Sequence, residues 1–439
     1  MAKTRSRVLH VLIGKDTIGH VEQSASGSLT FTYDDAWRDG PLQIPLSLSM
    51  PLSAREHPHS TIEAFMWGLL PDNEVLLKRW GERFQVSPRN AFALLAAMGE
   101  DCAGAVQFLT DEKRHALEND GHVRWLTEEE LGQRLAELRK DAAAGRRHGD
   151  PGQFSLAGAQ AKTALHYDPQ GDRWGVPEGG VPTTHIFKPP MPALSGHTEN
   201  EHFCLRLAAA SNLITARSEV RTFAGEKTIV VERYDRQRTA DGLIRIHQED
   251  MCQALAVHPF IKYEKDGGPG IVRIMNEVLN ASDEAELDRI RFMEALVFNF
   301  LIVGTDAHAK NYSMLLGPRG SARLAPFYDL ASLLPHLGQG EVEADLQDLK
   351  MAMRIGKTYP VLDIMPRHWE QTAKAAGFPV DMTMALLRHH IAQLPDLAVM
   401  VAEACRRDGV DHPVLARLTD LIAGRCRSLA GAYGAEALT

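Results

Sequence analysis

The stretch that decides the fold is ALVFNFLIVGTDAHAKN, residues 295–311, in which an almost wholly apolar run passes directly into polar and charged residues. The apolar part predicts a buried helix over residues 284–302. Asp306 and Asn311 follow it, five positions apart. Buried charge is costly without partners, so packing alone does not explain a buried helix that opens into such a cluster. The stretch therefore predicts a chemical site at the end of a core helix.

The spacing of Asp306 and Asn311 matches the D-x-x-x-x-N pattern of the protein-kinase catalytic loop. In that loop the aspartate orients and deprotonates a hydroxyl group, and the asparagine amide oxygen holds a metal ion beside the phosphates. Asp329 lies in the string PFYDL, residues 326–330, where a kinase places a second metal ligand. A helix cap is the structural alternative for each residue taken singly.

Two further features precede this loop in the order that a kinase has. The string SLAGAQAKT, residues 155–163, has small side chains that let backbone N–H groups approach phosphate oxygens, with Lys162 as a point charge. It is not a Walker loop, because Leu156 and Ala161 stand where that pattern requires glycine. Lys188 ends an apolar strand, which suits a charge held near phosphates. An ordinary turn and an edge-strand lysine are the alternatives for these features taken alone.

Secondary-structure signals change from strand-rich to helix-rich along the chain. Period-two alternation predicts strands mainly before residue 248, and helical periodicity dominates after it. We expect an α+β protein with a protein-kinase-like two-lobed fold, a β-rich N-lobe and an all-helical C-lobe. The expected strands include 163–167, 184–188 and 228–232, and the expected helices include 200–210, 250–255, 270–279, 367–376 and 381–407.

Composition and charge narrow the class of protein. The chain has 439 residues, of which 44% are apolar and 24% charged, close to globular averages and unlike disordered, collagen-like or coiled-coil chains. The net charge of −9 argues against a chain that coats nucleic acid or an anionic membrane by itself. Five dispersed cysteines without a CxxC pair argue against a disulfide framework or a zinc cluster. With apolar runs too short for a membrane span, we expect a soluble cytoplasmic protein without membrane contact.

Longer strings elsewhere resemble the HipA family, serine/threonine kinases that are toxins of bacterial type II toxin–antitoxin modules. LSLSMPL (46–52) and LLPD (69–72) are similar to the family's N-terminal subdomain. QEDMCQ (248–253) and YEKDGGPG (263–270) are similar to signatures of its C-lobe. The resemblance covers most of the chain. It implies three units: the N-terminal subdomain at 1–110, the remainder of the N-lobe with phosphate loop and hinge at 111–247, and the helical C-lobe at 248–439.

The resemblance also implies a role for each part of the candidate site, with ATP as the phosphate donor. The implied residues are Ala157, Gly158, Ala159, Gln160, Ala161 and Lys162 in the phosphate loop, Lys188 as the nucleotide lysine, Glu232, Arg233 and Tyr234 in a hinge that meets adenine through backbone groups, Asp306 as the catalytic base, and His308, Ala309, Lys310, Asn311, Tyr328 and Asp329 at the nucleotide and metal. Asn311 and Asp329 would hold Mg²⁺. Ser155 matches the serine that family members phosphorylate on themselves.

A substrate and a partner are implied as well. The best-known substrate of the family is glutamyl-tRNA synthetase, an aminoacyl-tRNA synthetase whose modification stalls translation and leads to growth arrest and persistence. The implied partner is a HipB-like helix-turn-helix antitoxin, with operator DNA reached only through the antitoxin complex. The chain departs from the family pattern at Ala161, where glutamate is common, and at Phe187, which replaces an aliphatic residue. Neither change removes a catalytic group, although the first alters how the loop would pack.

Two other functions remain open on the sequence. A small-molecule or lipid kinase on the same fold would carry the same motifs, because none of them selects a protein hydroxyl. A non-catalytic DNA corepressor partner of an antitoxin would place Lys350, Arg354 and Lys357 against phosphates. The intact catalytic-type aspartates and asparagine argue against a purely non-catalytic role.

Overall fold

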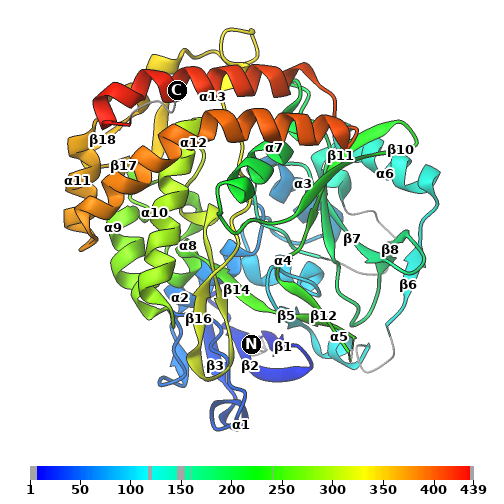
Figure 1. The fold of residues 1–439 in the computed structure, drawn as a ribbon. Helices are drawn as coiled ribbons and strands as arrows, with labels where there is room; N and C mark the ends of the chain where they lie inside the picture. Colours follow the sequence, from blue (N-terminus) through cyan, green and yellow to red (C-terminus); the bar gives the residue numbers. More distant parts are fainter. Residues whose placement is uncertain (1–6, 117–120, 146–153, 159, 241, 436–439) are drawn as a thin grey trace.

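The computed structural model describes residues 7–116, 121–145, 154–158, 160–240 and 242–435. In Figure 1 an N-terminal sheet lies at the bottom, a second sheet lies to the right, and most of the helices that follow it in the chain lie to the left and across the top. The fold is α+β and two-lobed, with an additional N-terminal subdomain, as the sequence predicts. In the part of the chain that the structure describes, no helix combines the length and apolarity needed to cross a membrane.

The N-terminal subdomain is an antiparallel sheet covered by helices. Its strand order is β4-β3-β2-β1-β5. Period-two alternation turns one face inward, where Phe31, Phe65 and Phe108 are fully buried together with residues of the covering helices. The strands are β1 (Arg7–Ile13), β2 (Asp16–Gln23), β3 (Leu29–Tyr33), β4 (Glu56–His57) and β5 (Val106–Leu109), and the helices are α1 (Asp35–Arg38), α2 (His59–Gly68), α3 (Glu74–Phe84) and α4 (Ala91–Met98).

The N-lobe sheet is also antiparallel, in the order β10-β11-β9-β7-β8-β6. Its strands are β6 (Val123–Trp125), β7 (Thr163–Asp168), β8 (Arg173–Pro177), β9 (His185–Lys188), β10 (Ser218–Phe223) and β11 (Glu226–Glu232). Helix α6 (Glu128–Lys140), which begins with a Thr127–Glu130 capping box, packs Leu131 and Leu135 against this sheet. Helix α7 (His197–Ala210) packs against β10 and β11 and faces the C-lobe. The remaining N-lobe elements are α5 (Asp111–Ala116), β12 (Arg236–Thr239) and β13 (Gly242–Arg245).

The C-lobe is predominantly helical, but the prediction that it is all-helical needs correction. Strand β14 (His247–Asp250) pairs with β15 (Ser313–Leu316), which pairs with β16 (Ala322–Leu324), and β17 (Lys350–Ile355) pairs with β18 (Thr358–Pro360). These strands are short, and tertiary pairing rather than a long alternating pattern stabilises them. The helices are α8 (Met251–Ala254), α9 (Ile271–Arg273), α10 (Ala285–Ile302), α11 (Pro366–Ala375), α12 (Val380–Arg407) and α13 (Pro413–Tyr433).

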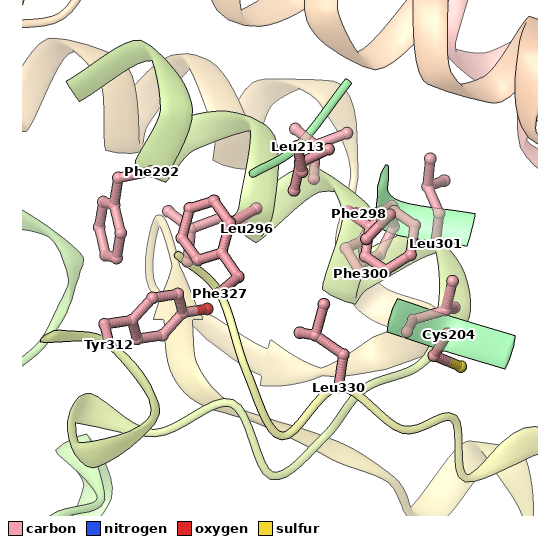
Figure 2. Close-up of a cluster of buried hydrophobic side chains, with 14 of the residues drawn as sticks. Cys204, Leu213, Phe292, Leu296, Phe298, Phe300, Leu301, Tyr312, Phe327 and Leu330 are labelled. Carbon is pink, nitrogen blue, oxygen red and sulfur yellow. The ribbon is translucent and has the colours of Figure 1, made fainter. Parts of the chain in front are cut away.

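The predicted core helix is α10, and its apolar side chains organise the C-lobe. Figure 2 shows Phe292, Leu296 and Phe298 of α10 gathered with Leu213, which follows α7, and with Phe327. Phe327 lies two residues before Asp329 in the sequence. Burial of an aromatic side chain stabilises a fold by roughly 1.5–3 kcal/mol. The same packing that holds α10 therefore also fixes the segment that carries Asp329.

Separate buried clusters accompany the three units. One cluster lies within the N-terminal subdomain and one within the N-lobe sheet, whereas the largest joins the C-lobe to α7 and to part of β11. The largest core therefore crosses the boundary that we place at residue 247. The division at 1–110, 111–247 and 248–439 stays a prediction.

Candidate active site

Lys188 is the centre of a buried charge cluster. Strand β9 carries it and ends there because Pro189 and Pro190 follow, and proline cannot donate a ladder hydrogen bond. The Lys188 ammonium donates to Oε1 of Glu201 on α7 at 2.6 Å and to Oδ1 of Asp329 at 2.8 Å. The lysine and glutamate side chains are only 8% and 2% exposed, so water screens this pair weakly.

The charges in this cluster shift one another's ionisation. Burial alone would lower the pKa of Lys188, but the carboxylates of Asp329 and Glu201 outweigh it and raise the pKa above its ordinary value. The Lys188 charge holds the pKa of Asp329 well below its usual range. Burial raises the pKa of Glu201. Asp329, whose pKa is lowered and whose side chain is the more exposed of the two carboxylates, is thus the stronger candidate to bind a cation.

Glu201 is a site residue that the sequence reasoning missed. Glu199 and Glu201 both lie on α7, and Glu199 pairs instead with Lys227 of β11 at 2.5 Å. Nothing in the local pattern tells which of the two meets Lys188. The available signal was chemical, because a kinase pairs its strand lysine with a helix glutamate. Oε2 of Glu201 is buried and has no hydrogen-bond partner among the described residues.

The predicted phosphate loop folds back on its own lysine. Lys162 Nζ donates to the backbone oxygen of Ala157 at 2.6 Å. Gly158 has φ +99°, a conformation that favours glycine, and a Cβ atom there would lie 2.6 Å from Lys162 Nζ and would displace that ammonium. Gln160 and Ala161 are half-buried, and Ala159 lies outside the described residues.

Lys162 lies electrostatically close to the charge cluster. Burial, together with the neighbouring charge of Lys188, lowers its pKa to about 8. Two lysines that disfavour each other's charge form a place where an added polyanion is stabilised. The loop and the strand lysine predicted from separate strings thus contribute to one cationic region.

Ser155 is fully buried at the start of the loop. Its hydroxyl donates to the backbone oxygen of Leu69 at 2.7 Å, just after α2 ends. Its N–H donates to the backbone oxygen of Asp101 at 2.8 Å. Both acceptors belong to the N-terminal subdomain, so a phosphate can reach this hydroxyl only if the loop leaves its place.

The catalytic-type loop begins where α10 ends. The helix closes with Val303 in a left-handed conformation, φ +56°, and the N–H of Gly304 donates to the Asn299 backbone oxygen at 2.8 Å. A β-branched residue rarely adopts this conformation, so the surrounding core must impose it. The chain therefore turns out of the core at Val303, and Asp306, three residues later, lies at the surface.

Asp306 and Asn311 are joined within the loop. The side-chain amide nitrogen of Asn311 donates to the backbone oxygen of Asp306 at 2.9 Å. The amide oxygen of Asn311 therefore points away from the Asp306 backbone. Oδ1 of Asp306 accepts from the Tyr263 hydroxyl at 2.6 Å. The Asp306 side chain is accessible to solvent, yet the surrounding protein desolvates it enough to raise its pKa.

His308 and Lys310 support the loop from inside. Burial, together with the charges of Lys262 and Lys310, lowers the pKa of His308 to about 3, so its ring is neutral at physiological pH. Lys310 is buried, and its ammonium donates to Asp250 Oδ2 at 2.6 Å and to the Gly68 backbone oxygen at 3.0 Å. The Lys310 ammonium therefore holds the loop against Asp250 and the end of α2. Ala309 is fully buried between them.

The predicted hinge follows β11. The Arg233 N–H donates to the Thr184 backbone oxygen at 2.9 Å, and its buried guanidinium pairs with Asp235 at 2.8 Å. The N–H of Glu232 donates to the Arg217 backbone oxygen, while its side chain is exposed. The backbone N–H groups of both residues are therefore already used within the protein, and the Arg233 backbone oxygen also accepts from the Arg236 N–H at 3.2 Å.

Tyr234 and Tyr328 form an aromatic wall between the predicted hinge and Asp329, the predicted metal ligand. The Tyr234 and Tyr328 rings lie 5.7 Å apart between centroids, tilted by 30°. The Tyr328 hydroxyl donates to the Lys310 backbone oxygen at 2.7 Å, and the next residue, Asp329, has φ +58°. The wall therefore connects the hinge, the catalytic-type loop and Asp329.

The basic residues of the β17–β18 hairpin take no part in the site contacts described above. Lys350, Arg354 and Lys357 are exposed on β17 and in the turn after it. Arg354 pairs with the Glu264 carboxylate at 2.9 Å. Their contact with DNA phosphates stays a hypothesis.

A buried strand lysine shared by a helix glutamate and a later aspartate, beside an Asp–Asn loop, defines a protein-kinase-like two-lobed protein. The family model described as the HipA-like C-terminal domain matches residues 154–398, more than half of the chain, and the HipA N-terminal domain matches residues 9–109. The chain therefore belongs to the HipA family.

Individual relatives agree with this assignment. The chain is 35% identical to Y4mE of Sinorhizobium fredii, a protein provisionally named a kinase, over 96% of this chain and 98% of that protein. It is 30% identical to the serine/threonine-protein kinase toxin HipA of Shewanella oneidensis, over 76% and 77% of the two chains. A chain of the solved Shewanella oneidensis complex of HipA, HipB and operator DNA matches with a TM-score of 0.82 and 25% identity, covering 97% of this chain and 98% of that one.

Proposed function

We propose that this protein is an ATP- and Mg²⁺-dependent serine/threonine-protein kinase that acts as the toxin of a type II toxin–antitoxin module. The observation that carries the proposal is Lys188, held between Glu201 and Asp329 at 2.6 and 2.8 Å. A lysine on a strand, a glutamate on a packed helix and a metal-type aspartate are the parts that position nucleotide phosphates in a kinase.

The phosphate loop and the two lysines suit ATP. Gly158 keeps the loop free of a side chain at the point where it approaches Lys162. Lys162 and Lys188 would pair with phosphate oxygens, which would relieve the mutual repulsion that lowers the Lys162 pKa. Tyr234 and Tyr328 would flank the base, and the backbone of residues 232–234 would read its edge.

The oxygen donors of Asp329 and Asn311 suit Mg²⁺. This ion is typically held by one or two carboxylates and by substrate phosphates, not by an all-protein cage. When bound, the ion would neutralise charge on the transferring phosphoryl group.

Asp306 would act on the acceptor. Its carboxylate would accept a hydrogen bond from a serine or threonine hydroxyl and take the proton as that oxygen bonds to the γ-phosphorus of ATP, while the bond from this phosphorus to the β–γ bridging oxygen breaks and ADP leaves. Asn311, tied to the Asp306 backbone, would keep the metal-side amide oxygen in a fixed relation to the base. His308, neutral and buried, would help to hold the loop without adding charge.

The proposed substrate is an aminoacyl-tRNA synthetase, with glutamyl-tRNA synthetase as the first candidate. The support is family membership and a relative that is itself named a serine/threonine-protein kinase toxin. Phosphorylation of such an enzyme would stall translation and bring about growth arrest and persistence.

The experiment is a phosphoproteome after brief expression of the wild-type chain and of Asp306→Ala. We expect a synthetase serine or threonine to be phosphorylated only with the wild type, and growth arrest to disappear in the variant. Asp363→Ala, which alters an exposed aspartate of the same lobe, is the matched control. Growth arrest caused equally by a folded Asp306→Ala protein would contradict the kinase mechanism, and labelled metabolites or lipids without labelled proteins would favour the rival kinase class.

The proposed partner is a HipB-like helix-turn-helix antitoxin, through which the protein would reach operator DNA. The support is the structural match to a chain of a solved HipA–HipB–operator complex. Co-expression with the product of an adjacent helix-turn-helix gene should yield a stable complex that retards operator DNA. The kinase alone should not retard that DNA, and retardation by the kinase alone would contradict this part of the proposal.

Self-phosphorylation at Ser155 is proposed as an off switch. A phosphate adds a charge of about −1.5 to −2 and would lose the Leu69 hydrogen bond that now anchors the loop. The phosphorylated protein should therefore lose ATP affinity relative to phosphatase-treated protein, with Ser155→Asp showing a partial defect. Equal affinities by calorimetry would end the switch while leaving the kinase assignment intact.

A further inference from the structure

The catalytic-type carboxylate is in contact with a residue outside the kinase motifs. Oδ1 of Asp306 accepts from the Tyr263 hydroxyl at 2.6 Å, and among the described residues this is the one hydrogen bond from a side chain to the Asp306 carboxylate. The other carboxylate oxygen is thus left for an acceptor hydroxyl. The Tyr263 ring also packs edge-on against His308, with centroids 5.0 Å apart. One side chain therefore touches the loop at two points.

The segment around Tyr263 is built to hold that ring. The N–H groups of Asp266 and Gly268 both donate to the Tyr263 backbone oxygen at 3.0 Å. A Cβ atom at Gly268 would lie 2.0 Å from the Ile261 backbone oxygen, so glycine is needed for the chain to close this tightly. The string YEKDGGPG is thus a compact turn that presents Tyr263.

Lys262 continues the contact toward another part of the molecule. Its ammonium lies 5.5 Å from the centre of the Tyr263 ring, a cation–π distance. The same ammonium forms an ion pair with Asp72, whose side chain is only 3% exposed. Asp72 lies between α2 and α3, in the N-terminal subdomain. Its second oxygen, Oδ1, is buried without a partner among the described residues.

We propose that Asp72, Lys262 and Tyr263 are positioning residues through which the N-terminal subdomain fixes the catalytic carboxylate of Asp306. The inference rests on the proposed kinase function. It explains why a buried aspartate outside both lobes is oriented at a lysine beside the site. It also gives the N-terminal subdomain a part in phosphate transfer itself. Reactive groups displaced by about 1 Å can lose on the order of 100-fold in rate, so a positioning role has a measurable size.

The test compares Tyr263→Phe, Asp72→Asn and the double variant with the wild type. Transfer from labelled ATP to dephosphorylated casein gives kcat and KM for ATP, and calorimetry gives ATP affinity and the fraction of molecules that bind. We expect Tyr263→Phe to lower kcat, per binding-competent molecule, by about 10- to 100-fold, with KM and affinity within about twofold. Asp72→Asn should lower kcat less, and the double variant should resemble Tyr263→Phe because both act through one chain of contacts.

Tyr167→Phe is the matched control. Tyr167 also donates to an aspartate, Asp172, at 2.8 Å, but it lies half-buried on β7 of the N-lobe sheet. Its loss should leave kcat unchanged. An unchanged or raised kcat in Tyr263→Phe, or a double variant whose loss is the product of the single losses, would overturn the inference.

Hydrogen exchange of residues 304–311 gives an arm that needs no phosphate transfer. Tyr263→Phe and Asp72→Asn should both speed exchange in this loop, whereas Tyr167→Phe should not. If the wild type transfers no phosphate to casein or to any protein, the proposed function fails while this arm still decides the positioning. Unchanged exchange in both variants would refute the positioning chain whatever the activity.

Discussion

At the scale of single residues, the proposed nucleotide site makes its sharpest prediction at Lys188. Lys188→Ala should weaken ATP affinity by roughly 1.5–3 kcal/mol, the size of a hydrogen bond to a charged group. The variant also leaves Glu201 buried without its cation, which adds to the loss of local order. Isothermal titration with ATP and Mg²⁺ measures the change.

Lys227→Ala is the control for this variant. Lys227 also joins the N-lobe sheet to α7, through Glu199 at 2.5 Å, but it does not contact Asp329. The control should bind ATP as the wild type does. Equal affinities of Lys188→Ala and the wild type would remove Lys188 from the nucleotide site.

Lys162 predicts a pH dependence of nucleotide binding. Its pKa in the free protein is about 8, so the ammonium is charged below that pH and progressively neutral above it. Phosphate favours the charged form, and ATP affinity should therefore fall as pH rises through about 8 toward the ordinary lysine pKa of 10.5. Binding should take up protons in that range. Calorimetry in buffers of different ionisation enthalpy checks this, and Lys162→Met should abolish the proton uptake.

At the scale of elements, the phosphate loop depends on one glycine. Gly158→Ala would place a methyl group 2.6 Å from Lys162 Nζ and would force a side chain into φ +99°. We expect ATP affinity to fall by at least about tenfold, because alanine strains the backbone at this φ and displaces the Lys162 ammonium from its place beside the loop. Titration with ATP measures the loss.

Gly180→Ala provides the comparison for the loop. No atom lies within 4 Å of the Cβ position at Gly180, and it precedes β9 in the same lobe. This variant should bind ATP normally. A Gly158→Ala protein with wild-type affinity would show that the loop adopts another conformation around the nucleotide.

Among the elements, the sequence predicted the long helices best, because their periodic apolar residues are a local signal. The run before Gly304 predicted α10, and the expected helix over 381–407 became α12 (Val380–Arg407), because long periodicity is the strongest local signal of a helix. Glu201 was not predicted as a site residue, since the packing of α7 selects it over Glu199. Sequence periodicity therefore predicted which segments are helices, whereas the packing of one element against another determines which side chains become partners.

At the scale of the whole molecule, the N-terminal subdomain is locked to the C-lobe through a buried acid. Glu249 of β14 accepts from the Leu48 N–H at 2.7 Å and from the Ser47 hydroxyl. Burial raises its pKa from 4.5 to about 8. The folded protein therefore keeps this proton between pH 4.5 and 8, where the unfolded chain has released it. The free energy of unfolding should fall as pH rises across that window.

Glu249→Gln tests this linkage. Glutamine resembles the protonated acid, so the variant should lose less stability than the wild type between pH 5 and pH 8. Glu403→Gln, on the exposed face of α12, should follow the wild type. Urea midpoints at the two pH values measure the difference. A Glu249→Gln protein with the wild-type pH dependence would place the titration elsewhere.

The contacts between the three units could not be predicted from the sequence. The string QEDMCQ is recognisable, but its function as a clamp depends on Ser47 and Leu48, about 200 residues away. Likewise, LLPD gives no sign that Leu69 accepts from Ser155 or that Asp72 faces Lys262. Long-range partners arise only when separate units dock.

Helix α13 follows the catalytic-type loop late in the chain and packs beside α12, as Figure 1 shows in red and orange. Both helices also pack against α7, which carries Glu201. Translation proceeds from the N-terminus at roughly 5–20 residues per second, so the nucleotide cluster emerges from the ribosome seconds before the helices that support it. A growing chain would thus bear every residue of the candidate site and still lack the helices that brace α7, so the proposed kinase activity would begin only after synthesis has passed Tyr433.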